Sequence, residues 1–456
     1  MSLNFKYFIN LISIIFLARF LSPEIFGKFA LLLGIIEIFF IVIFSDKFGI
    51  LRYNNFDHAY ESSLVASYFS IFLQVILFFI IISFIKFFQF SSDDYLDLLS
   101  LIFLYKLLRL SAEVNETWLE LKSDYKLIYF YNFISPIISN SISIYLAIKG
   151  YGIIVLILRE LIDSTIYFII FKVLFLNKIK LKNKVNFIFL KKIFSFSIKY
   201  TLYRFFEILS NRLPVYYFGF INNLNLAGIY DRSKYFTELS RNFFSQILDR
   251  VTYAFYGKNV SHKRQMFLLL LTSLLLKKII LIPISVIFFF HSYEIVNLIL
   301  GPNWVEAAKI IKILSIYIIF KDFSMSILAY LQMRFDNRYF IMSSMYFFFW
   351  MIIGCFFAYF TQNYFYIIYA ELIQAFTFLI FLFYKLFRVK LAINIALLFS
   401  SLIFTYLFYG AFNYFIDIKW YFSIFLLLIS YFSLNFYFLR SKKRYLNKFF
   451  LTKKNN

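Results

Sequence analysis

Long apolar runs recur along the whole chain and are separated by short polar connections. The first run ends at Arg19, the chain passes through Ser22, Pro23 and Glu24, and a second apolar run follows. Runs of roughly twenty apolar residues are long enough to cross a hydrocarbon core of about 30 Å as α-helices. The pattern predicts fourteen transmembrane spans, over residues 3–21, 29–45, 62–88, 95–116, 125–148, 150–173, 191–220, 227–257, 265–290, 306–332, 339–360, 364–387, 391–414 and 420–439.

The composition agrees with a membrane protein and excludes several other classes. Hydrophobic residues make up 62% of the 456 residues and charged residues only 16%, which is too little polar surface for a soluble protein of this size. A single cysteine, Cys355, excludes an intrachain disulfide framework and a cysteine-based zinc site, and the three histidines are scattered. We predict an all-α polytopic membrane protein with no cofactor, no metal site and no catalytic residues.

Basic residues gather on one set of connections. The connections after even-numbered spans and the C-terminus carry most of them, with dense runs over residues 172–192 and 440–454. The other connections are flanked by only four, which are Lys28, Lys86, Lys149 and Lys419. The positive-inside rule then places both termini in the cytoplasm. Anionic lipid headgroups account for the juxtamembrane lysines, so we expect no nucleic-acid partner despite the net charge of +23.

Two pairs of short, similar segments indicate an internal repeat. FGKFALL (26–32) resembles AGIYDRS (227–233), with Gly27 aligned to Gly228, and LELKSDYK (119–126) resembles LQMRFDNR (331–338). Both pairs link spans that are six apart, which predicts two six-helix lobes in a parallel pseudo-repeat around a central cavity. The expected domains are an N-terminal lobe (1–174), a cytoplasmic basic connection (175–190), a C-terminal lobe (191–388), a terminal helix pair (389–440) and a basic cytoplasmic tail (441–456).

Charged side chains inside the apolar runs recur at steps of three and four residues, so they form stripes on single helix faces. A charge at the bilayer centre costs at least about 2.5–3.5 kcal/mol, so these faces are expected to meet protein or water. Bases outnumber acids at mid-depth, which predicts a cationic cavity for an anionic cargo. The candidate cargo-binding bases are Arg109, Arg159, Arg204, Arg212, Arg241, Lys277 and Lys321. The acids Glu37, Asp163 and Glu207 either couple an ion or pair with a neighbouring base.

Four segments carry a resemblance to a known family. They are LARFLSPEIFGKFAL (17–31), SDKFGILR (45–52), LAGIYDRSKY (226–235) and LILGPNWVEAAKIIKIL (298–314). In order and spacing they resemble the polysaccharide-transporter branch of the MOP flippase superfamily, the O-antigen (Wzx-like) flippases. The sequence departs from the family pattern at Ser22, where a glycine is usual, and at Asn211-Arg212, where many members have arginine followed by aspartate.

The resemblance implies two lobes that open alternately to the two faces of the bacterial inner membrane. Its implied cargo is a polyprenyl-pyrophosphate-linked oligosaccharide, and its implied partners are membrane lipids, a polysaccharide polymerase and glycosyltransferases, around a monomer. Pro23, Gly27 and Gly228 are the expected hinge residues: Gly27 would permit the turn between the first two spans, and Pro23 would fix its entry.

Two other functions remain open at this stage. A membrane glycosyltransferase or polymerase is suggested by the acidic pair in SSDDY (91–95), although Ser92 as a helix cap and acids in a first helical turn explain that segment equally well. A cation-coupled multidrug antiporter of the same superfamily would share the fold. We therefore predict a transporter rather than an enzyme.

The topology prediction can be tested with reporter fusions. Fusions after Lys184 and Lys454 should report a cytoplasmic location, because both follow basic connections, while fusions after Asp94 and Asn223 should report the opposite side. An external signal from either of the first two fusions would refute the span assignment.

Overall fold

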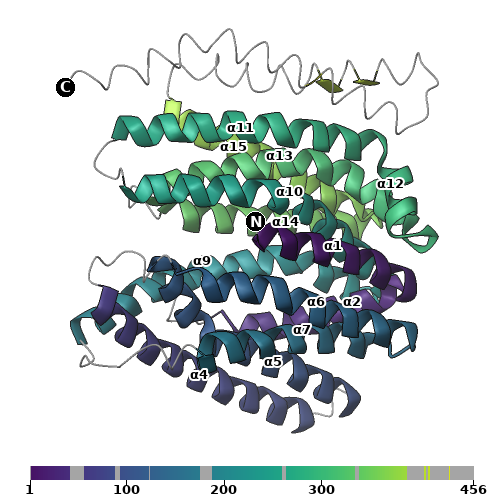
Figure 1. Ribbon diagram of the computed structural model, residues 1–456. Coiled ribbons are helices and arrows are strands. Elements are labelled where there is room, and N and C mark those ends of the chain that lie inside the picture. Colours follow the sequence, from purple (N-terminus) through teal and green to yellow (C-terminus); the bar gives the residue numbers. More distant parts are fainter. Residues whose placement is uncertain are drawn as a thin grey trace. The chain divides into compact units, whose positions relative to one another are not determined.

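The computed structural model describes residues 2–41, 56–87, 93–122, 124–174, 187–258, 263–333, 338–387, 405–406, 409–410 and 431. Within these ranges it contains thirteen α-helices, a π-helical turn and a 3-10 turn, and no β-strand (Figure 1). The α-helices are α1 (Ser2–Phe20), α2 (Pro23–Phe39), α4 (Phe56–Phe87), α5 (Asp93–Leu121), α6 (Lys126–Ile148), α7 (Ile153–Phe168), α9 (Phe187–Phe220), α10 (Leu224–Lys258), α11 (Lys263–Phe290), α12 (Ser292–Ile299), α13 (Val305–Met333), α14 (Arg338–Thr361) and α15 (Phe365–Phe387); the π-turn η1 is Ile169–Val173 and the 3-10 turn η2 is Pro302–Trp304.

The predicted all-α polytopic class is confirmed. Each of the first twelve predicted spans overlaps a helix, although α2 begins six residues before the predicted span 29–45, and span 150–173 is completed by η1. The last two, over 391–414 and 420–439, lie almost wholly outside the described residues, so the number fourteen is approximate. The short elements α12 and η2 were not predicted, because their residues 292–304 lie in a connection too short to form a span.

Several helices have the length and apolar composition needed to cross a bilayer. Five described helices meet both requirements alone, within Tyr60–Ile80, Lys126–Ile148, Arg264–Phe290, Arg338–Thr361 and Phe365–Leu386. The pair α1 and α2 meets them together across a bend of 120°. Other long helices, such as α5 and α10, carry more charged residues within their apolar runs. Their charges must be satisfied by neighbouring helices or water.

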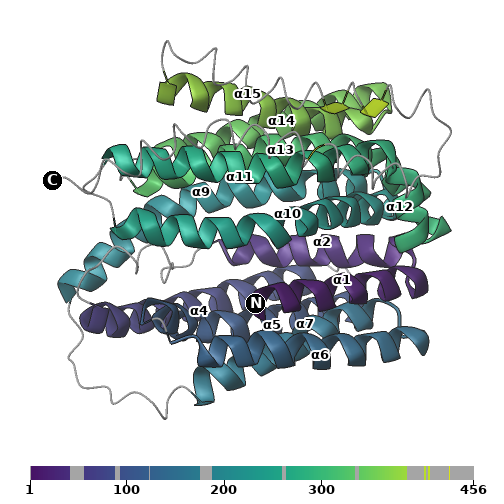
Figure 2. The ribbon, with the colours of Figure 1, turned by 45° about the horizontal axis from the view of Figure 1, so that its top comes forward.

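The chain divides into two compact units. The first contains Met1–Tyr235, Asn297–Ala307 and Phe340–Ile367, and the second contains Phe236–Val296, Ala308–Tyr339 and Ile368–Asn456. In the first unit α1 packs on α6, α7 packs on both α5 and α6, and α4 packs on α5, as Figures 1 and 2 both show. The predicted lobe bounds at 174 and 191 remain a prediction.

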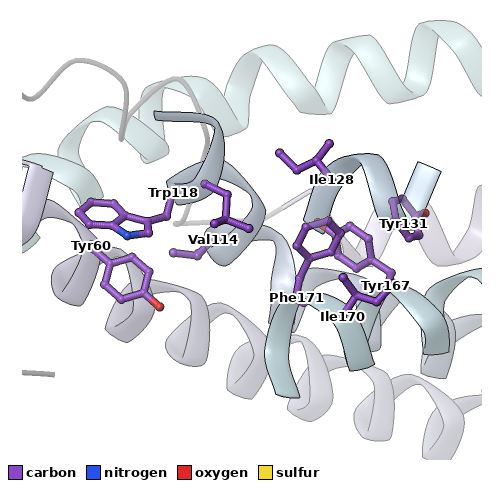
Figure 3. Close-up of a cluster of buried hydrophobic side chains, with 10 residues drawn as sticks. Tyr60, Val114, Trp118, Ile128, Tyr131, Tyr167, Ile170 and Phe171 are labelled. Carbon is purple, nitrogen blue, oxygen red and sulfur yellow. The ribbon is translucent and has the colours of Figure 1, made fainter. Parts of the chain in front are cut away.

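An aromatic core joins α4, α5, α6 and α7 in the first unit (Figure 3). The Tyr60 and Trp118 ring centroids lie 4.8 Å apart, and Tyr167 lies 5.2 Å from Tyr131 and 4.7 Å from Phe171. Burial of such rings is among the largest apolar contributions that single side chains make. This core fixes the helices that carry the charged side chains described below.

The reversal between α1 and α2 occupies only Leu21 and Ser22. Ser22 has extended backbone (φ −71°, ψ 155°), and Pro23 occupies the first turn of α2, where its missing N–H is not needed and its fixed φ suits a helix. Pro23 therefore begins α2, and its role as a hinge residue remains a prediction.

Gly27 plays a different role from the one expected. It lies inside α2 and is not among the glycines with positive φ, so it does not serve the turn. A Cβ atom on Gly27 would collide with the backbone carbonyl oxygen of Leu224, and a Cβ on Gly228 would collide with that of Pro23. The two glycines thus allow α2 and α10 to touch backbone to backbone, and each meets the residue four positions before the other.

We expect Gly27→Ala to destabilise the protein by about 1–3 kcal/mol, because rigid backbone atoms must move to admit the methyl group. Thermal unfolding of the purified protein would measure the loss. Gly34→Ala is the matched control on the same helix: its Cβ meets only the side chain of Tyr216, at 2.9 Å, which can rotate away. Equal losses for the two variants would contradict the role assigned to the Gly27–Gly228 contact.

Candidate functional site

The candidate bases fall into clusters in which most of them contact acids. Arg109, Arg159, Arg204 and Arg212 lie in the first unit, and Arg241, Lys277 and Lys321 lie in the second. We name three groups after their central residue: the Asp163 cluster (Lys6, Arg109, Tyr131, Ser135, Asp163), the Glu37 cluster (Glu37, Lys106, Arg212, Asp231, Arg232) and the Lys277 cluster (Arg241, Asp249, Lys277, Asp322, Ser326). Their use in cargo binding remains a prediction.

The Asp163 cluster joins α1, α5, α6 and α7. One carboxylate oxygen of Asp163 accepts a hydrogen bond from Ser135 at 2.5 Å and lies 3.6 Å from Lys6 Nζ. The other accepts from Tyr131 at 2.9 Å and from Arg109 at 3.3 Å. The Arg109 guanidinium also lies 5.2 Å from the centroid of the Tyr167 ring, and the Tyr167 hydroxyl donates to Glu116 at 2.7 Å.

Both oxygens of Asp163 are therefore engaged by the chain's own donors. Its side chain is only 13% exposed, and a carboxylate in such surroundings needs the neighbouring cations to offset its lost hydration. Lys6 and Arg109 occupy the places that an added cation would take. This geometry favours structural pairing over ion coupling at Asp163.

The Glu37 cluster joins α2 and α5 to α9 and α10. Glu37 Oε1 lies 3.2 Å from Lys106 Nζ, and Oε2 accepts from Arg212 Nε at 2.7 Å. Arg212 Nη1 lies 3.3 Å from Asp231, whose other oxygen binds Arg232. The helices α2 and α5 belong to the first predicted repeat and α9 and α10 to the second, so this network ties the two repeats together within the first unit.

Charge is not balanced in the Glu37 cluster. Three cations face two carboxylates, which leaves a net charge of +1. The side chains of Lys106 and Arg212 are 26% and 16% exposed, so the chain does not fully enclose either. The guanidinium of Arg232 also lies 5.0 Å from the centroid of the Phe26 ring, a cation–π distance.

The Lys277 cluster lies in the second unit on α10, α11 and α13. The ammonium of Lys277 is 1% exposed and lies 2.7 Å from Asp249 and 3.0 Å from Asp322. It also donates to Ser326 at 2.7 Å. Arg241 lies 3.9 Å from Asp322. A lysine enclosed this way is well placed to join three helices and poorly placed to reach a cargo.

The remaining candidates occupy separate places. Lys321 pairs with Glu238 at 2.7 Å in the second unit. Arg159 on α7 lies 3.9 Å from Glu160 and is 12% exposed. Arg204 and Glu207 are half-buried on α9, and Glu207 accepts a hydrogen bond from Tyr203 at 2.8 Å. Within the described residues, no group of three His, Cys, Asp or Glu side chains could hold a metal ion.

Two of the sequence motifs, 17–31 and 298–314, meet beside the Glu37 cluster. The buried indole of Trp304 donates to the carbonyl of Ala18 at 2.8 Å and packs edge-on against Phe26 at 5.4 Å. Gly301 precedes Trp304 with φ 96°, a conformation that suits glycine. Arg19 donates to the carbonyl of Leu298 at 2.6 Å. We call the contact of Ala18, Phe26 and Trp304 the tryptophan clasp; it lies within the first unit.

The sequence analysis did not identify Lys6 as a site residue, and it did not identify Trp304 as the partner of Ala18. Lys6 interrupts the first apolar run, and this was a usable signal because a charge inside a span requires a partner. Trp304 was quoted within a motif, but nothing in the sequence pairs it with Ala18, which lies 286 positions away. Such pairings follow only from the packing.

Comparison with known proteins gives a family match and a shared fold. A family model described as "Polysaccharide biosynthesis protein" matches residues 16–309. No curated protein matches the chain. The structure of a lipid II flippase, MurJ, in an inward closed conformation is similar with a TM-score of 0.71 and 16% identity, over 96% of this chain and 98% of that one.

Multidrug transporters share the fold at lower similarity. An inward-facing MATE family transporter of the MOP superfamily has a TM-score of 0.53 and 13% identity, over 88% of this chain and 96% of that one. A MATE transporter from Vibrio cholerae has a TM-score of 0.52 and 11% identity, over 83% and 93%. The chain therefore has the MurJ- and MATE-like fold.

Removing the acid of the Asp163 cluster should destabilise the protein. We expect Asp163→Asn to cost about 3 kcal/mol, because the largely buried Lys6 would be left without its counter-charge. Its abundance in membranes should fall, and adding Lys6→Met should restore much of it. If the single variant accumulates normally, the pairing assigned to Asp163 is wrong.

Proposed function

The chain belongs to the polysaccharide biosynthesis protein family, and from this premise we propose that it is a flippase for a polyprenyl-pyrophosphate-linked oligosaccharide. The cargo would be a repeat unit of an O-antigen, capsule or exopolysaccharide, carried across the bacterial inner membrane by alternating access. Both termini would be cytoplasmic, and the protein would act as a monomer alongside glycosyltransferases and a polymerase.

The cationic surplus of the Glu37 cluster is the observation that carries this proposal. A pyrophosphate needs several charge-assisted donors, and Arg212 and Lys106 supply a guanidinium and an ammonium close to one another through Glu37. Both are partly exposed, on helices from both repeats. A ligand bound there would contact both repeats at once, as alternating access requires of a cargo site.

The Glu37 cluster lies about one to three helical turns beyond the reciprocal glycine contact along α10 and α2. Asp231 follows Gly228 by three residues on α10, so it lies about 5 Å further along that helix. Glu37 follows Gly27 by ten residues on α2, about 15 Å further along. With the predicted topology the α1–α2 turn would lie on the outer side, so the glycine contact and the tryptophan clasp would close the outer end of this pathway.

A cation-coupled antiporter is the second candidate, because MATE transporters share the fold. The Asp163 cluster argues against it, since both oxygens of that carboxylate already bind the chain's own donors. The enzyme alternative rested on SSDDY, of which Ser91 and Ser92 lie outside the described residues; Asp93 and Asp94 begin α5. Acids in that position stabilise a helix start.

Arg212→Ala should lower glycan export at least about tenfold, because it removes one charge-assisted contact worth about 1.5–3 kcal/mol. Folding should tolerate the change, since Glu37 keeps Lys106 and Asp231 keeps Arg232. Arg212→Lys should restore export only in part, because lysine lacks the planar fork.

Cell-surface glycan and protein abundance would be measured together in cells that carry the native glycan pathway. Lys28→Ala is the matched control: it removes a cation from α2 whose partner is the exposed Glu24, at 2.9 Å. Normal export by Arg212→Ala at normal abundance would refute the cargo site.

A further inference from the structure

Glu37 pairs with Lys106 and Arg212, the two cations that the proposed function assigns to the cargo. We propose that Glu37 is an internal competitor of the cargo's phosphate groups, which holds Lys106 and Arg212 in the empty protein and yields them when cargo binds. The inference rests on the proposed function. It adds that cargo binding would break the Glu37–Arg212 ion pair, which connects the two predicted repeats.

The geometry of Glu37 resembles the geometry that a phosphate would adopt. Each of its two oxygens takes one cation, with Lys106 at 3.2 Å on one oxygen and Arg212 at 2.7 Å on the other. A phosphate group offers acceptor oxygens of the same kind with more charge. Arg212 contacts Glu37 through Nε and Asp231 through Nη1, so its donors are already directed at anions.

The charges favour exchange over simple addition. The cluster has one cation in excess, whereas a pyrophosphate carries at least two negative charges. A phosphate that takes both Lys106 and Arg212 therefore leaves Glu37 without its partners. Because Glu37 is 22% exposed, it can turn toward water instead of remaining buried and unpaired, which would be costly.

The exchange has a mechanical consequence. The Glu37–Arg212 pair joins α2 to α9, and these helices belong to different repeats. Cargo that displaces Glu37 removes this tie and supplies another through its own phosphates. A ligand shifts a conformational equilibrium only through different affinities for the two states, and competition with Glu37 provides that difference. The empty protein would retain the tie.

The other charged clusters do not combine these properties. The Asp163 cluster also has one cation more than carboxylates, and its Arg109 is 47% exposed, but its helices α1, α5, α6 and α7 all belong to the first predicted repeat, so it provides no link between repeats. Lys277 is 1% exposed between two carboxylates, so a lipid phosphate could not reach it without dismantling the contacts among three helices. The Glu37 cluster combines partial exposure, net positive charge and a link between repeats.

Binding to the purified full-length protein in lipid nanodiscs tests the inference. The probes are undecaprenyl pyrophosphate and, separately, inorganic pyrophosphate, each titrated at low salt. Glu37→Gln should bind both probes about tenfold more tightly than the wild type, since one charged competitor is removed. Glu37→Asp keeps the charge on a shorter side chain and should give a smaller gain. Export by Glu37→Gln should fall despite the tighter binding. The variant has no Glu37–Arg212 ion pair for the cargo to break, so cargo binding would no longer change the contact between α2 and α9.

Glu24→Gln is the matched control, because it makes the same change on the same helix at a residue that is 53% exposed. Its affinity should equal that of the wild type. No gain for either Glu37 variant, while Arg212→Ala weakens binding, would overturn the competition and leave the proposed function intact. Tighter binding of undecaprenyl pyrophosphate alone by Glu37→Gln, with unchanged affinity for inorganic pyrophosphate, would also overturn it, because competition between charges must act on both probes. Absence of lipid binding by the wild type and by every variant would refute the proposed function itself.

Discussion

The cost of an unpaired charge in hydrocarbon governs how the helices of this protein associate. A buried carboxylate or ammonium loses several kcal/mol of hydration, and only close opposite charges and hydrogen bonds offset that loss. Asp163 therefore draws α1, α5 and α6 around α7, and Lys277 draws α10 and α13 around α11. Apolar packing such as the aromatic core of Figure 3 then fixes these helices. Pairing selects which helices are neighbours.

A second constraint acts where backbones meet. The contact between α2 and α10 is reciprocal, because each glycine approaches the carbonyl of the residue four positions before the other. A two-fold relation between the repeats would produce this reciprocity, and it explains why Gly27 and Gly228 align in the sequence. Near the α2 start, Trp304 adds a hydrogen bond to Ala18. Three motifs that are separate in the sequence thus form one closed contact.

The Glu37 cluster differs from the other charged clusters because it combines an excess cation and partly exposed side chains with a link between the two predicted repeats. Paired charges that are fully enclosed stabilise a single arrangement, whereas partly exposed charges with an excess cation can exchange partners. The proposed phosphate-bearing cargo rests on this difference, within a fold that is shared with MurJ and with MATE transporters.

The sequence alone determined the class, the first twelve helices and the inventory of charges, because the length of an apolar run and the spacing of charges along a helix are local properties. It aligned Gly27 with Gly228 but assigned Gly27 to the turn, since the sequence does not reveal whether a glycine serves a turn or a close helix crossing. Only the tertiary structure joined Lys6 to Asp163, Glu37 to Arg212 and Trp304 to Ala18. Those pairings depend on which helix faces meet, and that is decided by simultaneous packing of the helices rather than by any one segment.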